Sequence, residues 1–117
     1  MVLREWERFK QRAIWSWEGW LFCWRHEKSL QQWIWANLVS ACLALLCDLT
    51  GAERAIILAL GILILAAELM NTAVEKAIDH TSTKEHPLAK AAKDCASGAV
   101  AISAIAAGVA WLAIWVG

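Results

Sequence analysis

Three long apolar runs, separated by short polar stretches, dominate the pattern along this chain. The helices that they predict cover residues 30–49, 52–78 and 88–116, and each has about the twenty residues needed to cross the ~30 Å hydrocarbon core of a membrane. Residues 1–25 instead place Trp and Phe on one helical face and mostly charged residues on the rest, which is typical of a helix lying on a membrane surface. The pattern therefore predicts an all-α integral membrane protein, with one amphipathic surface helix and three transmembrane helices in a single domain, residues 1–117.

The end of the second apolar run carries polar residues that membrane insertion does not require. Glu68 lies inside the apolar run, and Asn71 and Glu75 follow it by three and seven residues, so all three share one helix face. Charged residues within membrane-length segments are costly and are usually retained for a function. A solvated helix end is an alternative for Glu75, but it does not explain Glu68.

The start of the third helix repeats this arrangement. Lys90, Lys93, Asp94 and Ser97 follow a similar spacing. The segment Thr81–Glu85 is predicted to be a short loop between the two polar faces. Two polar helix faces joined in this way can close around one ligand.

Composition supports the membrane assignment, and the distribution of charge predicts how the chain is oriented in the membrane. With 60% hydrophobic residues and nine Trp in 117 residues, the chain is too apolar for a small soluble domain. Six of the eleven Lys and Arg precede the first apolar run, and four lie in or beside the loop after the second. The positive-inside rule therefore predicts a cytoplasmic N-terminus and loop, and an extracytoplasmic C-terminus. No nucleic-acid partner is expected, and the spacing of the four Cys predicts neither a disulfide nor a zinc site.

Four carboxylates are predicted to lie at the cytoplasmic face: Glu27, Glu68, Glu75 and Asp94. Converging carboxylates bind a hard cation such as Mg²⁺ through oxygen. Lys93 and Arg8 add positive charge of the kind that holds phosphate oxygens. Together these groups indicate phosphoryl transfer, although the chain has neither a P-loop nor the glycine-rich loop of a protein kinase.

Two segments of the chain match a known family in register. The sequence ELMNTAVE at residues 68–75, followed by HPLAKAAKD at residues 86–94, closely resembles the small prokaryotic integral-membrane diacylglycerol kinases, a family that includes undecaprenol kinases. Glu27 and Gln32 also fall where that family has acidic and Gln positions. The resemblance implies a homotrimeric helical bundle in the bacterial inner membrane. It would transfer the γ-phosphate of MgATP to a lipid hydroxyl at the cytoplasmic interface.

The resemblance also implies a role for each residue of the site. Glu68 would be the general base that takes the proton from the lipid hydroxyl. The other implied assignments are Glu27 and Glu75 for Mg²⁺, Lys93 for the γ-phosphate, Asn71 and Asp94 for positioning Lys93 and the nucleotide, Arg8 and His86 for ATP, and Gln32 and Ser97 for the lipid.

Alternatives remain for the acceptor and for the class of protein. Diacylglycerol, giving phosphatidic acid, is the favoured acceptor, but residues 86–90 are shared more with the undecaprenol kinases, so undecaprenol stays open. A small multidrug-type transporter would be expected to place its charge near mid-membrane at a repeat interface. A non-catalytic assembly protein would not explain the combined polar cluster. Both are weaker interpretations than the kinase.

Overall fold

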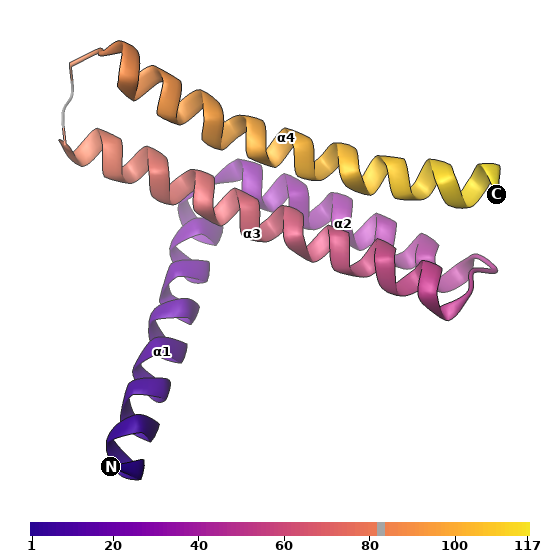
Figure 1. Ribbon diagram of the computed structural model, residues 1–117, viewed down its shortest axis with the longest axis horizontal. Coiled ribbons are helices and arrows are strands. Elements are labelled where there is room, and N and C mark those ends of the chain that lie inside the picture. Colours follow the sequence, from indigo (N-terminus) through magenta and orange to yellow (C-terminus); the bar gives the residue numbers. More distant parts are fainter. Residues whose placement is uncertain (82–83) are drawn as a thin grey trace.

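The computed structural model describes residues 1–81 and 84–117, and these residues form four α-helices. The helices are α1 (Val2–His26), α2 (Lys28–Leu46), α3 (Gly51–Thr81) and α4 (Pro87–Val116). Helices α2, α3 and α4 run alongside one another, and α1 leaves them at a steep angle (Figure 1). The last three helices are each long and apolar enough to cross a membrane. The predicted all-helical membrane architecture is thus confirmed for a single chain.

The helix ends differ from the predicted ones by up to three residues. Helix α2 ends at Leu46 instead of residue 49, and α3 extends to Thr81 instead of residue 78. The start of α3 is fixed by a capping box, in which the Thr50 hydroxyl accepts from Glu53 N (3.1 Å) and the Glu53 carboxylate accepts from Thr50 N (2.9 Å). The predicted loop Thr81–Glu85 begins one residue too early, because Thr81 still belongs to α3; residues 82 and 83 lie outside the described part of the chain.

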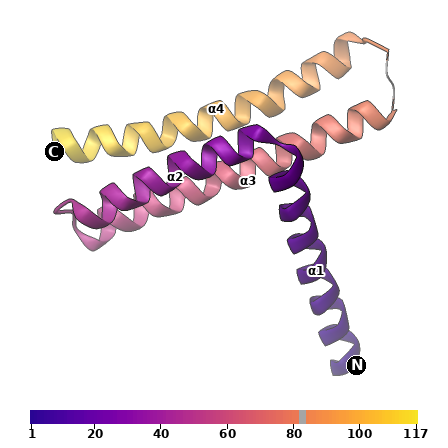
Figure 2. The same cartoon turned by 180° about the vertical axis from the view of Figure 1, so that it is seen from behind.

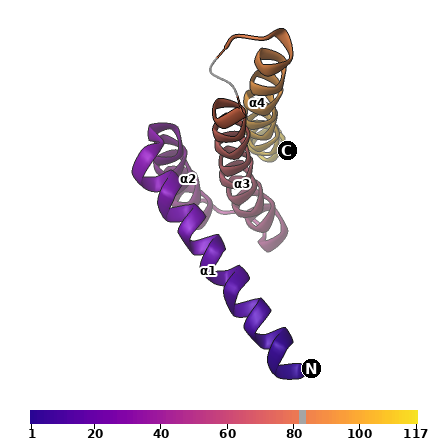
Figure 3. The ribbon, with the colours of Figure 1, turned by 90° about the vertical axis from the view of Figure 1, so that its left-hand side faces the viewer.

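Helix α3 is the central helix and contacts all three others. It lies between α2 and α4 when the bundle is viewed end-on (Figure 3). Near its start, Arg54 donates to the carbonyls of Ala44 (2.8 Å) and Leu49 (3.2 Å). The first is an acceptor that the end of α2 leaves without a helical partner, and the second lies in the turn that follows α2. The Trp111 indole donates to the Ser40 hydroxyl (2.9 Å), which joins α4 to α2. Residues on all three long helices thus fix the end of the bundle opposite the α3–α4 loop.

Asn37 and Gly61 mark a close approach of α2 to α3. The sequence predicts an interhelical hydrogen bond from Asn37, but its amide donates within its own helix to the Trp33 carbonyl (3.0 Å). The side-chain oxygen of Asn37 occupies the space where a Cβ on Gly61 would lie. Only glycine therefore fits at position 61 while Asn37 keeps this conformation.

Replacing Gly61 by Ala is expected to destabilise the bundle by about 1–3 kcal/mol, the usual cost of overpacking a tight contact. The measurement is the loss of folded protein on heating in detergent, followed by size-exclusion chromatography. The double variant Gly61→Ala/Asn37→Ala should recover much of the loss, because the smaller side chain removes the overlap. Gly19→Ala is the control, since nothing lies within 4 Å of a Cβ there. Equal stability of Gly61→Ala and the wild type would show that the two helices are not this close.

Candidate active site

Glu68 is the buried carboxylate of the bundle. It lies on α3 with only 3% of its surface exposed, and Thr72, one turn further along, is equally buried. The hydroxyl of Ser29, at the start of α2, donates a hydrogen bond to Glu68 Oε1. A buried carboxylate without such a partner would be strongly unfavourable. The contact therefore explains how the fold accommodates Glu68 beside apolar side chains.

The junction of α1 and α2, residues Cys23–Ser29 and here called the elbow, lies against the C-terminal half of α3 (Figure 2). Three side-chain contacts link the elbow to residues of α3 that are four apart and so share one helix face. They join Ser29 to Glu68, Cys23 to Thr72, and Glu27 Oε1 to Lys76 Nζ at 3.3 Å. The elbow thus covers the same face of α3 that carries the candidate base.

Cys23 on α1 is buried, as expected for a cysteine among apolar residues, but this expectation is wrong for Cys42, which is exposed. Burial raises the pKa of the Cys23 thiol, and a hydrogen bond with Thr72 lowers this pKa by a smaller amount. The thiol therefore stays protonated and packs as a small apolar group.

Asn71 and Glu75 lie one turn apart on α3, beside the buried face. The Asn71 amide donates to Glu75 Oε1 over 3.4 Å, and Asn71 Oδ1 is buried without a protein partner. Glu27 and Glu75 are both half-buried. The region therefore offers carboxylate and amide oxygens for a further ligand. Within residues 1–81 and 84–117, no group of three or more His, Cys, Asp or Glu could hold a metal ion.

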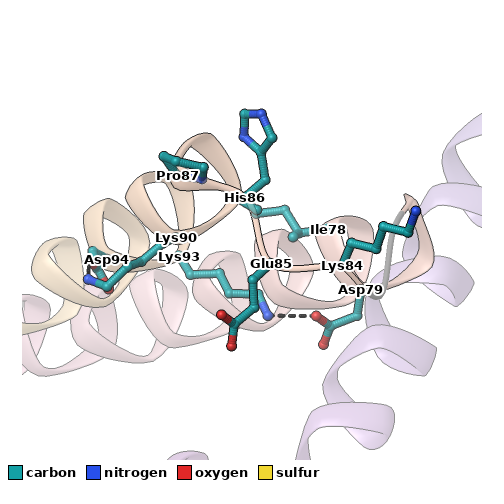
Figure 4. Close-up of a pocket in the computed structure, with 10 residues that line it drawn as sticks. Ile78, Asp79, Lys84, Glu85, His86, Pro87, Lys90, Lys93 and Asp94 are labelled. Carbon is teal, nitrogen blue, oxygen red and sulfur yellow. Dashed lines mark hydrogen bonds and ion pairs between the residues drawn. The ribbon is translucent and has the colours of Figure 1, made fainter.

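A pocket of about 980 Å³ opens between the end of α3 and the start of α4. It is lined by Ile78, Asp79, Lys84, Glu85, His86, Pro87, Ala89, Lys90, Lys93 and Asp94. Lys93 Nζ lies 2.6 Å from Asp79 Oδ1 in this pocket (Figure 4). Three lysines and three carboxylates, together with apolar residues, thus line one pocket between α3 and α4.

Lys93 and Asp94 have different partners from those that the resemblance implies. Lys93 pairs with Asp79 across to α3, and Asp94 pairs with Lys90 on its own helix (2.6 Å). Neighbouring residues on a helix point about 100° apart and do not face each other. In this chain Asp94 therefore does not hold Lys93 directly.

His86 is the N-cap of α4. Its Nδ1 accepts from Leu88 N (3.0 Å) and Pro87 follows at the first helical position, where a missing N–H costs nothing. The imidazole ring points away from the Lys93–Asp79 pair (Figure 4). His86 thus has a local structural role that leaves its Nε2 for a ligand.

The remaining predicted residues are spread over the chain. Arg8 pairs with Glu5 on α1 (3.0 Å), in the N-terminal half of the helix, which lies far from the α3–α4 loop (Figure 1). Gln32 on α2 and Ser97 on α4 are exposed. The chain by itself therefore brings Glu68, Asn71, Glu75 and Glu27 to one face of α3, but not Arg8.

Comparison with known proteins decides between the classes considered for this site. The prokaryotic diacylglycerol kinase family matches residues 14–115, almost the whole chain. The chain belongs to this family. It is thus a lipid kinase, and the resemblance found in the sequence is confirmed. The alternatives of a small multidrug-type transporter and of a non-catalytic assembly protein are set aside.

Individual relatives of this kinase support the same conclusion. The diacylglycerol kinase of Pseudomonas aeruginosa is 36% identical over 111 residues, covering 95% of this chain and 90% of the relative. The diacylglycerol kinase of Escherichia coli is 29% identical over 109 residues, covering 92% and 89%. The undecaprenol kinase of Bacillus subtilis is 42% identical over 73 residues, covering 59% of each chain.

Sequence reasoning missed two residues that touch the site, Ser29 and Lys76. A single Ser near a helix start reads as a helix-terminus residue, and a Lys at the end of an apolar run reads as a solvated charge. Their contacts with Glu68 and Glu27 depend on how the elbow packs against α3, which the sequence alone does not show.

Proposed function

We propose that this kinase transfers the γ-phosphate of ATP to the free hydroxyl of diacylglycerol, giving phosphatidic acid and ADP. The observation that carries the proposal is the buried, hydrogen-bonded Glu68 carboxylate on the same helix that ends at the pocket lined by Lys90 and Lys93. A base at an apolar helix face and a phosphate site at the polar end of that helix suit a lipid alcohol and a nucleotide that meet at the membrane surface. The names of the two diacylglycerol kinases, which align over most of this chain, support the acceptor.

The pocket between α3 and α4 is the proposed nucleotide site. Lys90 and Lys93 supply positive charge for phosphate oxygens, and His86 lies at the pocket edge with Nε2 available. Asp94 positions Lys90 in this chain, and Asn71 lies one turn from Glu75. Arg8 would contact ATP only if α1 or a neighbouring subunit brings it to the pocket.

Glu27 and Glu75 would hold the Mg²⁺ that accompanies ATP. Mg²⁺ is usually bound by one or two carboxylates together with substrate phosphates, which fits two half-buried carboxylates and the unpartnered Asn71 Oδ1. The bound ion supplies positive charge to the phosphate oxygens. Lys76 pairs with Glu27 in the chain alone, so this pair has to open when Glu27 takes up a ligand.

In the proposed reaction, Glu68 and Lys93 have separate roles. Glu68 accepts the proton of the lipid hydroxyl as the hydroxyl oxygen bonds to the γ-phosphorus, and the bond from that phosphorus to the bridging oxygen of ADP breaks. Lys93 leaves Asp79 and neutralises charge on the transferring phosphoryl group. Gln32 and Ser97, on the exposed faces of α2 and α4, would contact the lipid.

The proposed setting is the bacterial inner membrane. The N-terminus, the α3–α4 loop and the site would face the cytoplasm, and the C-terminus the other side, because the basic residues concentrate at one end of the spans. Helix α1 would lie on the cytoplasmic surface through its Trp-rich face. A homotrimer is proposed, since large apolar side chains such as Ile102, Ile105 and Leu112 point outward from α4, and a neighbouring subunit could supply Arg8.

The acceptor is tested by offering lipids separately to the purified protein in mixed micelles with ATP and Mg²⁺. Phosphorylated lipid from diacylglycerol, and little from undecaprenol, is the expected result. The undecaprenol arm is needed because the undecaprenol kinase relative matches 42% over the shared region. Product from undecaprenol alone would show that undecaprenol is the acceptor of the same phosphoryl transfer. Product from neither lipid, with folded protein, would refute the proposed reaction.

A further inference from the structure

The hydroxyl of Ser29 donates its hydrogen bond to Glu68 and does not cap a helix. Ser29 lies in the first turn of α2, where a Ser often caps the helix, but the N-cap position belongs to Glu27 and no side chain there makes a capping bond. The Ser29 hydroxyl instead reaches 39 positions along the chain to Glu68 Oε1. The hydrogen bond therefore links the start of α2 directly to the candidate base.

The position of Ser29 is itself restrained. Two further contacts of the elbow, Cys23 to Thr72 and Glu27 to Lys76, lie one and two turns beyond the Ser29–Glu68 bond along the same face of α3. Glu68 is only 3% exposed, so its carboxylate has little room to choose another orientation. The elbow consequently holds the donor at a fixed point beside a buried acceptor.

We propose that Ser29 is a positioning residue for Glu68, an inference that rests on the role of Glu68 in the proposed function. By donating to Oε1, the hydroxyl fixes the rotation of the carboxylate and leaves Oε2 to accept the proton of the lipid hydroxyl. A Glu side chain has three rotatable bonds, and holding its reactive oxygen in place removes an ordering cost from the chemical step. Ser29 itself contacts neither the lipid nor ATP in this scheme.

Two substitutions of nearly equal shape separate the hydroxyl from packing. Ser29→Thr keeps the hydroxyl and Ser29→Val replaces it by a methyl group. Ser29→Val is expected to lower kcat for lipid phosphorylation by about 10- to 100-fold, the scale of a lost hydrogen bond to a charged group, with KM for ATP little changed. Ser29→Thr is expected to restore most of kcat. An equal loss of kcat in both variants would mean that only the shape of the side chain matters. Wild-type kcat in both variants would mean that the hydroxyl has no role. Either result overturns the inference.

A double-variant cycle with Glu68→Gln distinguishes this inference from the function on which it rests. If Ser29 acts through Glu68, Ser29→Val should cause no further loss in the residual activity of Glu68→Gln. A further loss of the same size would show that Ser29 acts through the general fold. High activity of Glu68→Gln would show that Glu68 is not the base. An inactive Glu68→Gln together with a fully active Ser29→Val would refute only the positioning role of Ser29. Size-exclusion chromatography of each variant shows whether the protein is folded, and Ser29→Ala replaces Ser29→Val if the latter is not.

Discussion

Glu68→Gln is expected to lower kcat for lipid phosphorylation by about 100- to 10,000-fold, the range over which a positioned general base accelerates proton transfer. Gln has the same length and can still accept from Ser29, so the change removes the basic oxygen and little else. Because Glu68 is not in the pocket that we assign to ATP, nucleotide binding should be retained. The measurement is kcat and KM for ATP with diacylglycerol as acceptor.

The control for this substitution is Glu18→Gln, which removes a carboxylate from an exposed position on α1. It should leave kcat near the wild-type value. The assignment of Glu68 as base would be wrong if Glu68→Gln kept a kcat within a few-fold of wild type. A large rise in KM for ATP, with kcat unchanged, would instead place Glu68 in nucleotide binding.

Lys93→Met is expected to lower kcat by about 100- to 1,000-fold, as found when one group that stabilises transition-state charge is removed. In the chain alone, Lys93 is held by Asp79 at the edge of the pocket, within reach of phosphate groups that enter it. Methionine keeps most of the side-chain volume and removes the charge. Rates at saturating ATP separate this effect on kcat from weakened nucleotide binding.

Two further variants show whether the effect belongs to the site. Lys93→Arg should recover only part of kcat, since a guanidinium group differs in shape and donor geometry from an ammonium group. Lys10→Met, which breaks an exposed ion pair with Glu7 on α1, should have little effect. Comparable losses in Lys93→Met and Lys10→Met would point to a general effect of charge and contradict the role of Lys93.

The helices could be predicted from the sequence because apolar periodicity reports them directly. The exact ends could not, since they depend on specific caps: the Thr50–Glu53 box starts α3, and Arg54 binds the last carbonyls around the end of α2. The steep departure of α1 from the bundle was also not predictable. It follows from the contacts of the elbow with α3, and these join residues far apart in sequence.

For the site, spacing correctly placed Glu68, Asn71 and Glu75 near one another, because they lie on a single helix. Partners on different helices were harder to predict. The pairing of Lys93 with Asp79 depends on how α4 packs on α3, and the bond from Ser29 to Glu68 depends on the fold of the elbow. The sequence could not show that Arg8 lies far from the pocket, because this distance depends on the angle of α1 (Figure 1).

In the proposed reaction the γ-phosphate of ATP moves to a lipid hydroxyl at Glu68, and a labelled γ-phosphate can be followed through this transfer. Purified protein in mixed micelles would receive diacylglycerol, Mg²⁺ and ATP labelled either in the γ-phosphate or in the α-phosphate. We expect γ-label in phosphatidic acid with the wild type, no α-label in any lipid, and only background γ-label with Glu68→Gln. Wild-type γ-label that remains in ATP or appears only as inorganic phosphate, or γ-labelled lipid formed equally by Glu68→Gln, would contradict the proposed reaction.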